Sequence, residues 1–308
     1  MTAPQAAIDG EGTPALAAPR ALPASLRRLG DGLALLGRRP AMGIGALLLI
    51  TLAVVALFGP WLRAGDPWDM AGAPLLWPFE DAAFPLGTDL MGRDIATGLI
   101  SGARVSLLIG LVSSALSALL GVAVGALGGF YRGGVDAVLG RVTEVFQTVP
   151  KFVLAVVLVA LFKPAITTEV IAIGIVSWPA TARLVRAEFM RLREREFVLA
   201  AETMGMSDWR LILTQILPNA LPPVVVVSTL TVANAIQTEA ALSFLGLGDP
   251  NVMSWGTIIG GGRDQVIDAW FICALPGAAI VIAVLAFNLL GEGLSDAVNP
   301  HLRQRAAA

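Results

Sequence analysis

The polar stretch EFVLAAETMGMSDWRLILTQILP, residues 196–218, lies between hydrophobic segments and decides how the chain is organised. Its small pair, Ala200 and Ala201, is followed four positions later by Gly205. A glycine at that distance permits a left-handed residue at the end of a helix, where the chain reverses. The pattern predicts a short helix and a turn.

A second short helix follows the turn in the same stretch. Ser207 or Asp208 is suited to cap its start, because their side-chain oxygens accept hydrogen bonds from free backbone N–H groups. Trp209 then falls in the first turn, and Leu217-Pro218 predicts the end of the helix. The two helices together form a unit that a partner protein can bind.

The composition excludes an ordinary soluble domain. Hydrophobic residues make up 56% and charged residues 14% of the 308 residues, whereas soluble domains hold nearly half apolar and about a quarter charged residues. The chain has one cysteine, Cys273, and one histidine, His301. We therefore expect neither a disulfide framework nor a Cys/His metal cluster within it.

Six hydrophobic segments approach the ~20 residues that a membrane-spanning helix needs. They are Ala41–Phe58, Val105–Phe130, Val142–Phe162, Thr168–Val185, Asn219–Ala241 and Phe271–Leu290. Only helices or closed barrels satisfy the backbone in lipid. The predicted fold is an all-α membrane protein, a polytopic bundle of about six transmembrane helices.

The distribution of cationic residues orients this bundle. With the N-terminus inside, fifteen arginines fall in inner segments, whereas four arginines and Lys163 fall in outer ones. Such an excess marks the cytoplasmic side. We expect both termini and the loop 186–218 to be cytoplasmic.

The sequence also suggests how the remaining parts divide. Leucines at positions 22, 26, 29, 33 and 36 share one helical face, which is typical of an interfacial amphipathic helix. The expected parts are a disordered cytoplasmic tail (1–24), this interfacial helix (25–40), the first transmembrane helix (41–60), a periplasmic segment (61–104), a core of five further helices (105–300) and a cytoplasmic tail (301–308).

The second span carries a small residue at every fourth position. The stripe consists of Ser113, Ser117, Gly121, Gly125 and Gly129. Small residues let another helix approach closely within a membrane. We expect this face to pack against a neighbouring helix rather than to line a solute groove.

Five motifs in order along the chain resemble one known family. Besides RRPA at 38–41, they are PLGTDLMGRDIATGLISGARVSL (85–107), AAETMGMSDWRLILTQILPNAL (200–221), EAALSFLGLG (239–248), SWG (254–256) and AFNLLGEGLSDAVNP (286–300). They are similar to the C-type permease subunit of dipeptide/oligopeptide/nickel ABC importers, a binding-protein-dependent inner-membrane component of bacteria. The resemblance covers about four-fifths of the chain.

The resemblance implies a function for the stretch 196–218. In this family the loop is the coupling loop that docks onto an ATPase. The residues that correspond to it here are Ala200, Ala201, Gly205, Ser207, Asp208, Trp209, Leu217 and Pro218. Ala200 and Ala201 would give a smooth surface that enters a cleft on the ATPase.

The resemblance also implies the partners. They are a homologous second permease, two ABC ATPase subunits that hold ATP and Mg, and an extracytoplasmic solute-binding protein. The surroundings are the lipid bilayer, and no nucleic acid is expected. This chain itself would bind no cofactor and catalyse no reaction, while it forms half of the path for a small peptide or peptide-like solute.

Ionisable and polar groups within spans are candidates for the translocation path, because burying them in hydrocarbon is costly. Lys151 either faces the path and meets an anionic solute, or it snorkels toward the cytoplasmic side or pairs across the subunit interface. Glu144 shares its predicted helical face, so that the two residues can form a pair. Asn234 and Gln237 share a face that is a second candidate. Glu239 is a candidate for gate or interface structure.

Two other functional classes remain as alternatives. An ion-coupled secondary transporter would use the six spans and Lys151, but it leaves the stretch 200–221 without a purpose. A scaffold or signalling membrane protein would carry no solute. An ATPase within this chain is excluded, because no glycine-rich phosphate loop with Lys-Ser/Thr is present.

Overall fold

The computed structural model describes residues 40–63 and 65–298, and within them the regular elements are all helical. The expected tails, 1–24 and 301–308, and all of the expected interfacial helix except Pro40 lie outside the described residues. The helices are α2 (Pro40–Leu62), α3 (Ile95–Tyr131), α4 (Gly133–Thr148), α5 (Lys151–Leu161), α6 (Ile166–Arg193), α7 (Glu196–Thr203), α8 (Asp208–Arg210), the π-helix η1 (Leu211–Ile216), α9 (Leu217–Phe244), α10 (Trp255–Gly262), the 3-10 helix η2 (Arg263–Gln265) and α11 (Phe271–Val298).

Five helices in the described part are long and apolar enough to cross a membrane, and a bent pair makes a sixth candidate. The five are α2, α3, α6, α11 and the continuous helix from Asp208 to Phe244. The number of spans agrees with the sequence prediction. The second span is longer than predicted, because α3 already begins at Ile95, so that the expected periplasmic segment 61–104 ends in helix.

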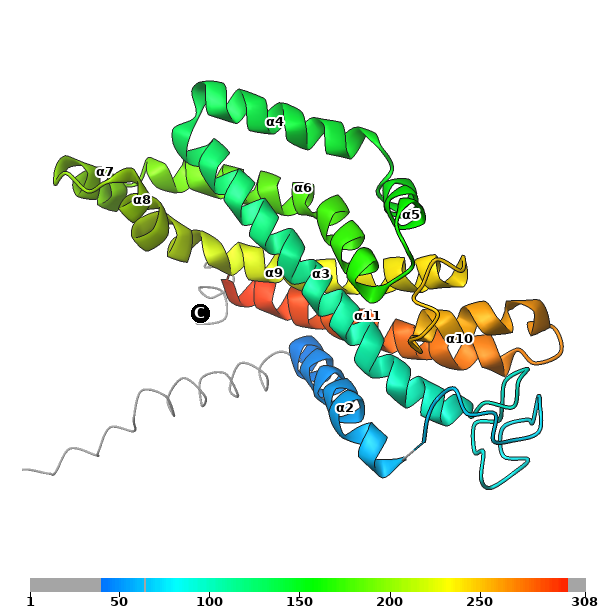
Figure 1. The fold of residues 1–308 in the computed structure, drawn as a ribbon. Helices are drawn as coiled ribbons and strands as arrows, with labels where there is room; N and C mark the ends of the chain where they lie inside the picture. The colour runs from blue at the N-terminus through cyan, green and yellow to red at the C-terminus, as the bar shows by residue number, and fades with distance from the viewer. Residues whose placement is uncertain (1–39, 64, 299–308) are drawn as a thin grey trace, which may run out of the picture. The chain divides into compact units, whose positions relative to one another are not determined.

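The third predicted span, Val142–Phe162, is wrong as one straight helix. α4 and α5 meet at an angle of 86°, and Figure 1 shows α5 turning away from the line of α4. Pro150 lacks an N–H group and disfavours helical conformation at the residue before it. Val149 is accordingly extended, with φ −89° and ψ 133°.

The predicted helix end at Leu217-Pro218 is also wrong. The chain stays helical from Asp208 to Phe244, with the six residues Leu211–Ile216 wound as a π-helix just before the proline. The Leu217 N–H donates to the Ile212 carbonyl, five residues back. A wider turn leaves room for the ring of Pro218 and for its missing hydrogen bond, so the helix continues.

The small-residue face of α3 packs against α6, as the sequence predicted. A Cβ at Gly121 would lie 2.5 Å from the Thr181 Cβ, and one at Gly129 would lie 2.6 Å from the Phe189 Cβ. Gly125 lies directly against the Ala182 carbonyl. Because lipid offers no hydrophobic drive for helix association, close backbone approach holds these two helices together.

The segment between α2 and α3 is folded by its polar residues. Asp94 caps α3 by accepting hydrogen bonds from the backbone N–H groups of Ala96 and Thr97, and it forms an ion pair with Arg63 at 2.6 Å. Gly87 and Gly92 have φ of 80° and 78°, a left-handed backbone conformation that glycine adopts without strain.

Candidate functional site

The helices α7 and α8 form a tip that joins α6 to α9 (Figure 1). Gly205 has φ of 80°, and the Met206 N–H donates to the Ala201 carbonyl at 3.1 Å while the Gly205 N–H donates to the Glu202 carbonyl at 2.9 Å. This pair of bonds is a Schellman motif, which ends α7 and reverses the chain. The predicted left-handed turn at Gly205 is confirmed.

The tip is fixed to the bundle by its inner face. Val198 and Ala201 are buried in one hydrophobic cluster with Val185 and Phe189 of α6 and Ile216 of η1. The prediction that Ala200 and Ala201 form one smooth surface is therefore wrong. Neighbouring residues on a helix point about 100° apart, and only Ala200 faces outward.

The tip exposes four large apolar side chains, which the sequence analysis did not single out. Met204 and Trp209 are 77% and 60% exposed, and Phe197 and Leu199 also lie on the surface. We call Phe197, Leu199, Met204 and Trp209 the tip patch. Phe197 and Leu199 stand on either side of the buried Val198 in sequence, and so they flank the buried face of α7 from opposite sides. Exposed apolar residues gathered in this way mark interaction surfaces.

The remaining predicted residues of the loop lie around this patch. Ser207 occupies the N-cap position of α8 but makes no side-chain capping bond, and Asp208 is in the first turn. Gly205, Ser207, Asp208 and Pro218 are exposed, and Leu217 is half-buried. The predicted cap is thus correct in its position but not in its hydrogen bond.

A hollow of about 390 Å³ between α5, α6 and α9 brings Lys151 and Asn234 together. Ser177, Thr231 and Thr238 add hydroxyl groups to its wall, which is otherwise apolar. No carboxylate is among the described residues that line it. Gln237 is exposed on the same helix as Asn234 but does not line the hollow.

The suggested pairing of Lys151 with Glu144 is wrong. The bend at Val149-Pro150 removes the common helical face on which it depended. Glu144 instead pairs with Arg141 one turn earlier, at 3.0 Å. Lys151 is the first residue of α5, where the helix dipole is positive, so that its charge does not stabilise the helix.

Glu239 is fully buried and ties three helices together. Its carboxylate accepts hydrogen bonds from Ser106 of α3 at 3.1 Å and from Ser243 of α9 at 3.0 Å. The Ser106 hydroxyl also accepts from the backbone N–H of Trp255, the first residue of α10, at 3.3 Å. Glu239 therefore holds helices together, and it does not line the hollow that contains Lys151.

A second buried carboxylate, Glu169, was missed by the sequence analysis. It accepts a hydrogen bond from the Asp249 N–H at 3.1 Å, and the Asp249 carboxylate accepts from the Ile166 N–H at 3.3 Å. These reciprocal bonds join the start of α6 to the turn after α9. The partners are 80 and 83 residues apart in sequence, and nothing in the local pattern links them.

The helices, the tip and the hollow define an integral membrane transport subunit. Residues 117–304 match the family model described as "Binding-protein-dependent transport system inner membrane component", and the chain belongs to this family. It is the non-catalytic transmembrane permease of an ABC importer, whose partner ATPases bind ATP.

Curated relatives cover most of the chain. The di/tripeptide transport system permease protein DppC of Pseudomonas aeruginosa is 41% identical over 85% of this chain and 88% of its own length. The dipeptide permease DppC of Haemophilus influenzae is 34% identical over 85% of this chain and 90% of its own length. The glutathione permease GsiD of Pectobacterium atrosepticum is 35% identical over 85% of this chain and 87% of its own length.

Solved structures agree with the fold. An inward-facing MetNI methionine ABC transporter superimposes with a TM-score of 0.54 at 20% identity, covering 65% of this chain and 96% of that one. At this identity the likeness shows the arrangement of helices and not the solute.

Proposed function

We propose that this chain imports di- or tripeptides or related peptide-like solutes as one of two permease subunits. Three permeases that resemble this chain over most of their length are named for di/tripeptides, dipeptides and glutathione. The second, homologous permease supplies the other half of the path. Two ATPases and a solute-binding protein complete the importer, which lies in the bacterial inner membrane with both termini of this chain in the cytoplasm, as the arginine distribution supports.

The observation that carries the coupling role is the tip patch on a rigid base. Met204 and Trp209 expose apolar surface, while Val198 and Ala201 hold the tip to α6 and η1. Closure of the ATPases would move the tip as one piece and, through it, α6 and α9. Ala200, Gly205, Ser207 and Asp208 would form the exposed border of the docking surface, and Leu217-Pro218 would carry the movement into α9.

Reconstitution of the whole transporter tests this function. Proteoliposomes with both permeases and both ATPases should accumulate a radiolabelled dipeptide only when ATP is inside and the binding protein is outside. Collapse of the ion gradients should leave the initial rate unchanged. Uptake without ATP that disappears with the ion gradient would instead establish the ion-coupled transporter, and no uptake of any peptide would reject the proposed solute class.

Lys151 and Asn234 are proposed to line the path, with Gln237 farther along the same face of α9. The Lys151 ammonium group and the positive N-terminus of α5 meet at a hollow without carboxylates. The Asn234 amide and the hydroxyl groups of Thr231 and Thr238 add hydrogen-bonding atoms. This set suits the carboxylate of a peptide as it passes.

Replacing Lys151 with glutamine should therefore lower the uptake of a dipeptide with a free C-terminal carboxylate by about tenfold, the effect of losing one charge-assisted hydrogen bond. Uptake of the same dipeptide with an amidated C-terminus should change little, provided that the binding protein accepts both. Lys163→Gln is the matched control, since Lys163 is the other lysine of the chain and does not line the hollow. An equal loss for both peptides would remove Lys151 from carboxylate recognition.

A further inference from the structure

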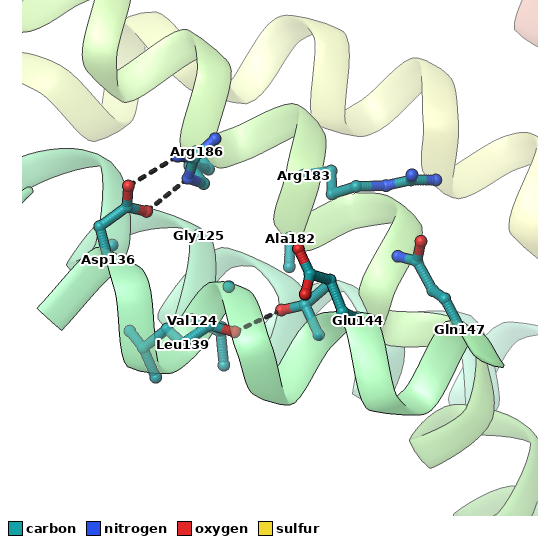
Figure 2. A pocket seen from close by; sticks show the side chains of 12 residues that line it. Val124, Gly125, Asp136, Leu139, Glu144, Gln147, Ala182, Arg183 and Arg186 are labelled. Atoms are coloured by element: carbon teal, nitrogen blue, oxygen red, sulfur yellow. Dashed lines mark hydrogen bonds and ion pairs between the residues drawn. The ribbon is translucent and has the colours of Figure 1, made fainter. Parts of the chain in front are cut away.

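A second hollow, of about 260 Å³, lies between α3, α4 and α6 and has no role in the proposed path. Figure 2 shows its polar wall, with Asp136 and Arg186 at one end and Arg183 and Gln147 at the other. Val124, Gly125 and Gly128 of α3 also line it. It has room for roughly nine water molecules at their volume in the liquid.

The charges of this hollow are compensated except at Arg183. The Arg186 guanidinium donates two hydrogen bonds to the Asp136 carboxylate. The Glu144 carboxylate, which also lines the hollow, pairs with Arg141. Arg183 has no ion pair with any of the described residues. Among the described residues, Arg183 is therefore a solvent-exposed cation of this wall without a counter-ion.

A neutral donor beside Arg183 is also unsatisfied. The Nε2 atom of Gln147 is buried and has no hydrogen-bond partner in the described part of the chain. In Figure 2 the Arg183 guanidinium and the Gln147 amide lie at the same end of the hollow. A buried donor without an acceptor is costly, and an oxyanion between these two groups would satisfy both.

The surroundings of the hollow indicate that this oxyanion belongs to an amphiphile. The side of α4 turned away from the hollow exposes a stripe of valines, which suits contact with lipid tails. The stripe consists of Val135, Val138, Val142 and Val145, and the exposed Val149 follows the end of the helix. Arg183 and Arg186 lie near the end of α6 that leads into the tip, the cytoplasmic end in the topology proposed above.

We propose that this hollow binds the phosphate of an anionic phospholipid of the inner leaflet, held by Arg183 and Gln147. Basic pockets between transmembrane helices on the cytoplasmic side are suited to such head groups. A lipid bound here would pack between α4 and α6. The choice of the inner leaflet rests on the topology given with the proposed function. The binding site itself does not depend on that function.

Thermal unfolding of the delipidated transporter complex tests the site. Short-chain phosphatidylglycerol should raise the Tm of the wild-type complex, while inorganic phosphate should not. Phosphatidylcholine of the same chain length should not raise it either, because its trimethylammonium group offsets the phosphate charge and would lie beside Arg183. Arg183→Gln should raise the phosphatidylglycerol concentration needed for half of the shift by about fivefold, the effect of one arginine at an anionic membrane surface. Gln147→Leu, which keeps the size but removes the donor, should act in the same direction.

Arg191→Gln is the matched control. Arg191 is an exposed arginine of the same helix, paired with Glu188 at 2.6 Å, and it does not line the hollow. Equal losses in Arg183→Gln and Arg191→Gln would show general surface attraction and overturn the site. An equal Tm shift with inorganic phosphate would assign it to free phosphate, and an equal shift with phosphatidylcholine would show that the head group is not recognised; either result rejects the proposal.

Discussion

Replacing Met204 and Trp209 together with alanine should release the ATPase subunits from the permease while this chain stays folded. Both side chains are more than half exposed, so their removal takes little from the hydrophobic core. Buried tryptophans at the centre of protein interfaces each contribute about 2 kcal/mol or more. We expect the affinity for the ATPase to fall by at least about 30-fold, and transport to fall with it.

The measurement is co-purification of the ATPases with the tagged permease, followed by titration of the isolated ATPase onto the permease pair. Trp270→Ala is the matched control, because Trp270 is 54% exposed and lies just before α11, far along the chain from the tip. The double variant and the control should have the same Tm in detergent. An unchanged yield of ATPase with the double variant would remove the tip patch from the docking surface.

Gly125→Ala should separate α3 from α6 and destabilise the bundle. The added Cβ would meet the Ala182 carbonyl oxygen and lie 2.8 Å from the Val185 Cβ and 3.0 Å from the Arg186 backbone nitrogen. Two of these three atoms belong to the backbone and cannot move aside by changing rotamer. Overpacking of this kind typically costs about 1–3 kcal/mol, which denaturant titration of the purified chain in mixed micelles would measure.

A change to alanine at Gly277 should affect stability in the opposite direction from Gly125→Ala. This glycine is in the interior of α11, and a Cβ there would meet nothing within 4 Å. Alanine is favoured over glycine within a helix by roughly 0.5–1 kcal/mol, so Gly277→Ala should leave stability unchanged or raise it. If both variants lost stability equally, close packing of α3 on α6 would not be the reason.

The sequence was sufficient for features that depend on local pattern. Hydrophobic length located the spans, the spacing of small residues predicted the packing face of α3, and Gly205 marked a turn that the structure contains. Proline was harder to interpret. Pro150 bends one predicted span by 86°, whereas Pro218 is accommodated by a π-helix and interrupts nothing. Their different effects depend on the turns that precede them.

The features that the sequence did not reveal depend on contacts between distant residues. Ala200 and Ala201 look equivalent until the tip packs on α6 and buries only the second. Lys151 and Asn234 meet because α5 turns toward α9, and Glu169 finds the Asp249 turn across 80 residues. Such pairings are set by the whole bundle and leave no periodic signal in either segment.

The length of α6 has a mechanical consequence. Its 28 residues form one helix, about 42 Å long at 1.5 Å per residue, with the Glu169–Asp249 contact at its start and the tip just beyond its end. Pro179 lies inside this helix and removes one backbone hydrogen bond, so that α6 can bend between its two anchored ends. In the proposed importer, a displacement of the tip would therefore reach the Asp249 turn partly as a bend of α6 at Pro179.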